Sequence, residues 1–213
     1  MEPGPKWRRR KTARPGEIEA AALSVFAERG FAAAKLEDIA ARAGLSKAAL
    51  YRYFPTKLDL FKAVIGLRAA PNLDEVAIVL QSAELGFADV ARIVLARMAA
   101  VVDQPELRGL ARMVIAEGRN FPEIVALWHE QLVSRAVGML SALIAEGQRR
   151  GEVRDGEPRA MAFSVIGPML LTAIWKEVME PIGGDPIDPA AVAAEHFLTL
   201  TRGMIATPPE ETP

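Results

Sequence analysis

Hydrophobic residues recur along most of this chain with the period of an α-helix. The first clear instance has apolar side chains three or four residues apart, at Ile18, Ala22, Val25 and Phe26. Such spacing places side chains on one face of a helix, which turns once in about 3.6 residues. No segment carries a convincing strand pattern, and no internal repeat is present. The pattern predicts an all-α protein of about nine helices.

Glycine, proline and capping residues mark the ends of the first predicted helices. The first ends at Gly30, because glycine commonly follows the last residue of a helix. The second covers residues 36–43 and stops at Gly44. Ser46 is an N-cap residue for a short third helix, which Pro55 terminates. Two short helices joined by a brief turn that contains glycine define a helix-turn-helix.

The rest of the chain continues the helical pattern. Thr56 and Asp59 form a variant of the capping box, which predicts a fourth helix to about residue 67. Apolar periods predict further helices over 73–80, 90–102, 107–118, 122–150, 158–180 and 188–204. We therefore expect four segments: a flexible basic arm (1–13), a helix-turn-helix domain (14–62), a larger helical domain (63–206) and a frayed tail (207–213).

Charge is distributed unevenly, although the formal net charge is only −1. Residues 1–62 hold 13 Lys and Arg against 7 Asp and Glu, whereas the remaining residues hold 13 against 20. A basic end on an acidic body is typical of a protein that binds a polyanion with that end. The basic residues of 6–14 either enter a DNA minor groove, which attracts arginine, or form a tail that adds nonspecific affinity.

The predicted third helix carries the chemistry of a DNA-reading element. In a helix-turn-helix, the second helix enters the major groove and the first crosses the backbone. Ala48 and Ala49 are small enough to approach base edges and offer methyl groups to thymine. Lys47, Tyr51 and Arg52 carry groups that bind phosphates or bases. The plainer alternative is an amphipathic helix with its aromatic side chains in the core.

The stretch ALSVFAERGFAAAKLEDIAARAGLSKAALYRYFPTKLDLFKAV carries a family resemblance. It is similar to the DNA-binding domain of the TetR (AcrR-type) transcriptional regulators. The resemblance covers roughly the first third of the chain. It implies a homodimer that binds double-stranded DNA at an operator, and it places eight residues at DNA-contacting positions: Lys35, Lys47, Ala48, Ala49, Tyr51, Arg52, Tyr53 and Lys57.

One departure from the family pattern concerns the start of the second helix. The family usually has Thr or Ser just before it, which both caps the helix and contacts phosphate. This chain has Ala34 and Lys35 there. Lys35 can still pair with a phosphate, but the helix loses a good cap, typically worth ~1 kcal/mol.

Residues 111–133 resemble the ligand domain of the same family, which implies a small-molecule effector. Methionine, aromatic and polar side chains suit an adaptable cavity, although core packing or solvation explains each of them singly. The pocket candidates are Met98, Met113, Glu117, Phe121, Trp128, His129, Met161 and Trp175. The last two long helices are the implied dimer faces, with candidates Phe163, Ile166, Leu170, Ile174, Phe197 and Leu200.

Other functional classes lack their motifs. The chain has no cysteine, which excludes disulfides and thiolate catalysis and fits a cytoplasmic location. A zinc motif at His129 and Glu130 lacks its second histidine, because residue 133 is valine. No stretch is long and apolar enough to span a bilayer. We expect a ligand-responsive repressor without enzymatic activity, metal or cofactor, with a constitutive DNA-binding regulator as the alternative.

Overall fold

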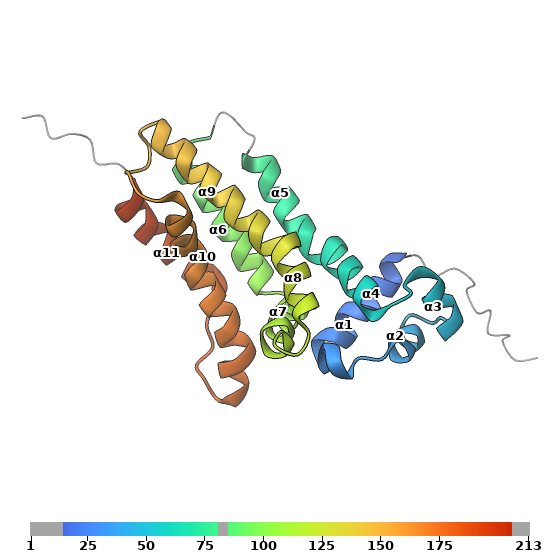
Figure 1. Cartoon of the computed structure of the whole chain (residues 1–213). Helices are drawn as coiled ribbons and strands as arrows, with labels where there is room; N and C mark the ends of the chain where they lie inside the picture. The colour runs from blue at the N-terminus through green and yellow to red at the C-terminus, as the bar shows by residue number, and fades with distance from the viewer. Residues whose placement is uncertain (1–14, 81–84, 206–213) are drawn as a thin grey trace, which may run out of the picture.

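The computed structural model describes residues 15–80 and 85–205 (Figure 1). Within these ranges the chain forms nine continuous helical runs and no strand, apart from an isolated bridge between Val153 and Ile205. The all-α prediction is confirmed. The predicted arm (1–13) and tail (207–213) lie outside the described residues.

The first four helices form one end of the molecule (Figure 1). They are α1 (Pro15–Ala33), α2 (Leu36–Arg42), α3 (Lys47–Tyr53) and α4 (Lys57–Val64). Helices as short as α2 and α3 are unstable alone, so tertiary packing must hold them. Phe26, Ile39, Leu50 and Phe61 supply that packing, since each side chain is fully buried.

The fourth helix does not stop where the sequence pattern predicts. It passes through a π turn, η1 (Ile65–Ala69), into α5 (Ala70–Leu80). In a regular helix, Pro71 would lack a backbone donor and its ring would clash with the carbonyl four residues earlier. The π turn, in which the Ala70 N–H donates to the Ile65 carbonyl, widens the helix just before this proline. One continuous helix therefore joins the two ends of the molecule.

Long helices form the rest of the molecule, which we call the C-terminal body (Figure 1). Its helices are α6 (Phe87–Val102), α7 (Pro105–Glu117), α8 (Pro122–Trp128), α9 (Ser134–Arg149), α10 (Pro158–Ile174) and α11 (Pro189–Met204). Three further turns extend them: η2 (His129–Val133) joins α8 to α9, and η3 (Trp175–Met179) and η4 (Glu180–Ile182) continue α10. The predicted helices over 122–150 and 158–180 are confirmed to within one or two residues.

Buried side chains form two clusters, and their border does not follow the expected domain boundary near residue 62. The first cluster joins α1–α4 to α7 and α8, through Leu110, Met113 and Ile124 among others. At its centre, the Phe31 ring lies 5.8 Å from that of Phe61 and 5.3 Å from that of Phe121, between centroids. The second cluster holds α5, α6, α9, α10 and α11 together. Helix α7 is thus packed directly on the N-terminal helices.

Candidate nucleic-acid interface

The turn between α2 and α3 is set by backbone conformation and a cap. Gly44 has a φ of 70°, in the left-handed region that favours glycine. The Leu45 N–H donates to the Ala40 carbonyl at 2.8 Å, which closes the end of α2. Ser46 then caps α3, since its hydroxyl accepts from the Ala49 N–H at 3.2 Å. The predicted helix-turn-helix and its cap are confirmed.

Helix α3 turns one face to the core and the other to solvent. Leu50 is fully buried, whereas Tyr51 and Tyr53 are 39% and 44% exposed. The predicted contact residues divide accordingly: Ala49 and Lys57 are half-buried, and six are exposed, namely Lys35, Lys47, Ala48, Tyr51, Arg52 and Tyr53. The exposed set offers cations and tyrosine side chains on one surface.

Lys47 is held at the junction of α2 and α3 by weak, exposed contacts. Its ammonium forms an ion pair with Glu37 and lies 5.7 Å from the centroid of the Tyr51 ring. The hydrogen bond between them raises the pKa of Lys47 and lowers that of Glu37. The two side chains are 59% and 46% exposed, so water screens the pair. A phosphate can therefore compete with Glu37 for the ammonium.

Lys35 occupies the N-cap position of α2, and its side chain makes no capping hydrogen bond. The missing cap predicted from the sequence is confirmed. The side chain is exposed at the start of the helix, where backbone N–H groups and a cation lie together. Both groups suit an anion.

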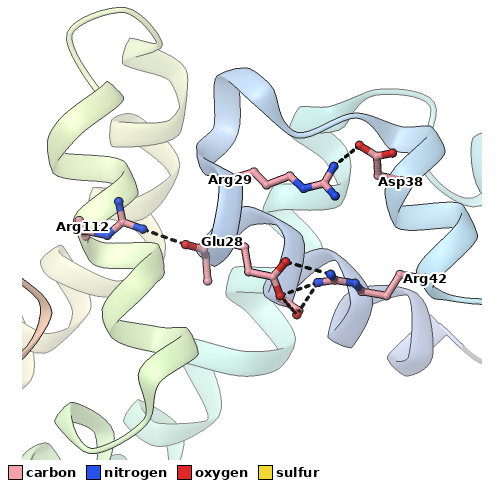
Figure 2. A network of polar contacts seen from close by, with 7 residues as sticks. Glu28, Arg29, Asp38, Arg42 and Arg112 are labelled. Atoms are coloured by element: carbon pink, nitrogen blue, oxygen red, sulfur yellow. Dashed lines mark hydrogen bonds and ion pairs between the residues drawn. The ribbon is translucent and has the colours of Figure 1, made fainter. Parts of the chain in front are cut away.

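Exposed ion pairs fasten α2 to α1 (Figure 2). The Arg42 guanidinium donates to both carboxylate oxygens of Glu28, at 2.7 and 2.9 Å. Arg29 and Asp38 form a second bridge at 2.5 Å. The hydrogen bond from Arg42 is the main reason that the pKa of Glu28 lies below its ordinary value. These pairs orient α2, and with it α3, from the solvent side.

Lys57 faces into the protein. Its ammonium donates to the carbonyls of Ala32 (3.2 Å) and Ala34 (3.1 Å), contacts the Phe31 carbonyl, and lies 4.6 Å from the Phe31 ring centroid. Burial lowers the pKa of Lys57. The cation sits at the C-terminal end of α1, where the helix dipole favours positive charge. Its contacts here are with the protein backbone, in contrast to the phosphate role that the family resemblance implies.

A break in α1 is completed by a side chain from α7. Gly30 has φ 78° and ψ 171°, a conformation essentially restricted to glycine. In an uninterrupted helix the Phe31 N–H would donate to the carbonyl four residues earlier. Here it donates to Oε1 of Glu117 at 3.1 Å, and the Ala32 N–H donates to Oε2 at 2.6 Å. The carboxylate of Glu117 therefore caps the last turn of α1.

Arg112, which precedes Glu117 on α7, contacts the backbone of α1 on the other side of the break at Gly30. Its Nη2 donates to the Ala27 carbonyl at 2.8 Å (Figure 2). That carbonyl is the one that the Phe31 N–H would reach in a regular helix. Helix α7 thus supplies both an acceptor and a donor to the backbone of α1. No feature of the sequence pattern singled out Arg112.

Sequence comparison places this architecture among known regulators. Residues 18–64 match the family model of bacterial regulatory proteins of the tetR family. Residues 90–183 match the model of the C-terminal domain of AefR-like transcriptional repressors. The chain belongs to the TetR family. This is a family of transcriptional regulators and not of enzymes.

Individual relatives within the TetR family match parts of the chain. The activator FasR of Mycolicibacterium smegmatis is 48% identical over 52 residues, which is 24% of this chain and 24% of FasR. The repressor BepR of Brucella suis is 28% identical over 141 residues, 62% of this chain and 65% of BepR. The chain therefore spans less than two thirds of either relative.

Solved structures share the TetR-family fold over nearly the whole chain. The structure of FadR from Bacillus subtilis in complex with stearoyl-CoA has a TM-score of 0.73 at 17% identity, covering 89% of this chain and 99% of FadR. A TetR-family regulator of Pseudomonas syringae has a TM-score of 0.70 at 22% identity, covering 91% and 98%.

The C-terminal body of this TetR-family chain has a partly open cavity of about 300 Å³ between α5, α6, α7, α8, η2, α9 and α10. Most of its lining is apolar, including Val76, Val94, Val101, Leu132 and Met169. Of the predicted pocket residues, Met98 and Trp128 line this cavity. Both lie on faces that the helical period turns toward the centre of the body.

The other six predicted pocket residues lie outside the lining. Met113 and Phe121 pack in the first core cluster and Met161 in the second. Polar contacts hold the remaining three elsewhere: Glu117 on the backbone of α1, His129 beside the Ser134 hydroxyl at 3.1 Å, and Trp175 on the Asp185 carbonyl at 2.8 Å. Residue type alone could not predict which side chains line this cavity, because a methionine or tryptophan fills a core as readily as it lines a cavity.

The continuous helix Pro158–Ile182 exposes an apolar face. By length and composition it could cross a membrane, with 28% of its most apolar window buried, which corrects the expectation that no stretch is long enough. The run is longer than expected because η3 and η4 carry it past Ile174. Leu171 on this helix is 63% exposed. The remaining sides of α10 pack on α6, α9 and α11.

The predicted dimer residues of the TetR-family chain differ in exposure. Phe163 is 54% exposed, Leu170 48% and Ile174 36%. Ile166 and Phe197 are half-buried, and Ile166 also lines the cavity. Leu200 is buried in the second core cluster at 7% exposure, so its side chain offers little surface to a partner.

Proposed function

We propose that this chain is a cytoplasmic, ligand-responsive repressor that binds a palindromic DNA operator as a homodimer. The observation that carries the proposal is the division of α3. Leu50 fixes the helix to the core, while Lys47, Tyr51 and Arg52 face solvent together. We assign residues 14–62 to DNA binding and residues 63–206 to effector binding and dimerisation.

On DNA, the exposed face of α3 enters the major groove. Ala48 and Ala49 have small side chains at the start of the helix, so its backbone comes close to the base edges. Tyr51 and Lys47 bind phosphates, and Arg52 reaches phosphates or bases, with Tyr53 and Lys35 at the margins. Lys57 supports this surface from behind, through the carbonyls at the end of α1.

Dimerisation uses the exposed face of α10. Phe163, Leu170, Leu171 and Ile174 supply an apolar surface, and α11 lies alongside. Packing this face against its copy gives a four-helix interface. Two-fold symmetry then sets two α3 helices against half-sites about 34–36 Å apart, which is why we expect a palindromic operator.

Repression with release by an effector is supported by the match to the AefR-like repressor model and by the repressor BepR. The FadR structure holds stearoyl-CoA, which shows that this fold accommodates an amphipathic ligand. The apolar cavity favours such an effector over the alternative, a regulator that binds DNA constitutively. The effector we expect is small and apolar or amphipathic.

A gel-shift series tests the DNA surface, with DNA selected from a random pool and a scrambled version of it. Arg52→Ala should weaken binding to the selected DNA by about tenfold and alter sequence preference. Tyr51→Phe, which removes one hydroxyl, should weaken binding to both DNAs alike. Lys47→Ala should lower the slope of log affinity against log salt by about one.

Arg149→Ala is the matched control for loss of an arginine. Arg149 is 74% exposed at the end of α9, in the C-terminal body. It should bind both DNAs like the wild type. Unchanged affinity in all three α3 variants would contradict the assignment of this surface to DNA binding.

A further inference from the structure

Three polar side chains line the otherwise apolar cavity: Asn72, Arg97 and Arg108. Arg97 is 54% exposed and pairs with Glu75 at 2.6 Å, so it belongs to the outer surface. Arg108 is different, because only 12% of its side chain is exposed. Its Nη1 donates to the Val102 carbonyl at 2.6 Å. A buried guanidinium inside an apolar cavity is costly unless its donors are paired.

The Nε of Arg108 is the donor left over. It is buried and has no hydrogen-bond partner within the described residues. The nearest carboxylate oxygen, Oε2 of Glu177, lies 3.5 Å away, long for a charged hydrogen bond. The other oxygen of Glu177 accepts from Nε of Arg112 at 2.9 Å. One carboxylate is therefore shared by two guanidiniums, which leaves a net positive charge beside the cavity.

We propose that the cavity binds an organic carboxylate with an apolar body, and that its carboxylate pairs with the guanidinium of Arg108, which lines the cavity. This inference rests on the proposed function and names the chemical class of its effector. A carboxylate balances the charge of this guanidinium, whereas a neutral ligand leaves that charge uncompensated. The apolar lining takes the rest of the molecule.

The same contacts connect the cavity to the DNA-binding helices. Glu177 bridges Arg108 to Arg112, and Arg112 donates to the Ala27 carbonyl of α1 just before its break at Gly30. Figure 2 shows Arg112 reaching from α7 toward α1. A bound carboxylate repels the like charge of Glu177 and loosens its hold on Arg112. The ligand thus favours a different placement of α1, and with it of α3.

Calorimetric titration of the full chain tests the ligand class. The probes are straight-chain carboxylates from hexanoate to tetradecanoate and 2-naphthoate, each beside the alcohol of the same skeleton. The best carboxylate should bind at least about tenfold more tightly than its alcohol. Arg108→Met should abolish that difference, and Glu177→Gln, which removes the competing charge, should tighten carboxylate binding.

Arg97→Met is the matched control, since Arg97 lines the cavity but pairs with Glu75 at the surface. It should keep the preference for carboxylates. If Arg108→Met does not fold, Glu177→Gln still decides, because a merely structural role for Glu177 would not tighten binding. The inference is overturned if no carboxylate binds, if the alcohols bind equally well, or if Glu177→Gln fails to tighten binding.

The connection to α1 is tested with Arg112→Met in a gel shift with the best carboxylate. This variant should still bind the carboxylate in the calorimetric titration but no longer release DNA when ligand is added. Release by ligand in Arg112→Met would overturn the connection. Operator binding by the ligand-free wild type is measured separately, so failure of the carboxylate proposal and failure of the DNA-binding proposal give different results.

Discussion

The N-terminal helices and the C-terminal body are specified by different kinds of interaction. In the N-terminal end, neighbours in sequence fix the geometry. The Asp59 N–H donates to the Thr56 hydroxyl at 3.0 Å, and the Thr56 N–H donates back to the Asp59 carboxylate at 3.1 Å. In the body, helices far apart in sequence meet around a cavity. The turns and caps of the DNA surface are therefore set locally, whereas an effector site depends on the whole bundle.

Helix α7 belongs to both regions. Its Leu110 and Met113 lie in the core of the N-terminal end, and its Arg108 lines the cavity of the body. The contacts between α7 and α1 are therefore where the N-terminal helices depend most directly on the C-terminal body. Variants that disturb these contacts should have the largest effects on folding, and variants on the outer surface the smallest.

The largest effect is expected at the break in α1. Gly30→Ala places a side chain at φ 78°, and its Cβ would lie 2.0 Å from Oε1 of Glu117. The substituted residue must strain its backbone or displace the Glu117 cap. We expect a loss of about 3 kcal/mol in the free energy of unfolding, measured by urea denaturation.

Gly138→Ala is the control for adding a methyl group. Gly138 lies inside α9, and among the described residues no atom outside the adjacent helix backbone lies within 4 Å of the added Cβ. Alanine is the better helix former, so this variant should gain about 0.5–1 kcal/mol. Equal stabilities of the two variants would contradict the account of the junction.

The local signals at the N-terminal end could be read from the sequence. Ser46, Thr56 and Gly44 act on residues within one turn of themselves, so their roles follow from spacing. The missing cap at Lys35 was predictable for the same reason. The location of Lys57 was not. Its backbone partners lie more than twenty residues away, and that pairing exists only after α1 and α4 have packed.

The residues that line the cavity could not be predicted from local sequence in this way. Met98 and Trp128 were named by residue type, but six other candidates of similar type lie elsewhere. Leu200 was expected at a dimer face and is buried within the chain. Helix α10 is apolar on most sides, so periodicity could not say which side meets the core. Arg108 gave no signal at all, because burial of an arginine depends on the tertiary fold.

An intermediate effect is expected at Lys57. Lys57→Met keeps much of the side-chain volume but leaves the carbonyls of Ala32 and Ala34 without this donor. We expect a loss of about 2 kcal/mol in the free energy of unfolding. We expect operator affinity to fall by a similar factor at all salt concentrations, because the ammonium contacts backbone carbonyls at the end of α1.

Lys62→Met, on the exposed side of α4, is the matched control and should unfold like the wild type. The salt dependence of DNA binding separates the two possible roles of Lys57. If Lys57→Met has wild-type stability and its slope of log affinity against log salt is lowered by about one, then Lys57 contacts a phosphate instead.

The smallest effect is expected at the ion pairs between α1 and α2. The hydrogen bond from Arg42 lowers the pKa of Glu28 from its ordinary 4.5, so the folded protein binds this proton less readily than the unfolded chain. The pair therefore stabilises the fold above about pH 4.5, and its contribution disappears as the pH falls through the lowered pKa. Glu28→Gln should shift the urea midpoint only slightly at neutral pH, because an exposed pair contributes little, and the shift should shrink as the pH falls below 4.5. Glu195→Gln, on the exposed side of α11, controls for loss of a carboxylate. A shift for Glu28→Gln that persists unchanged in acid would mean that packing, and not this ion pair, holds α2 against α1.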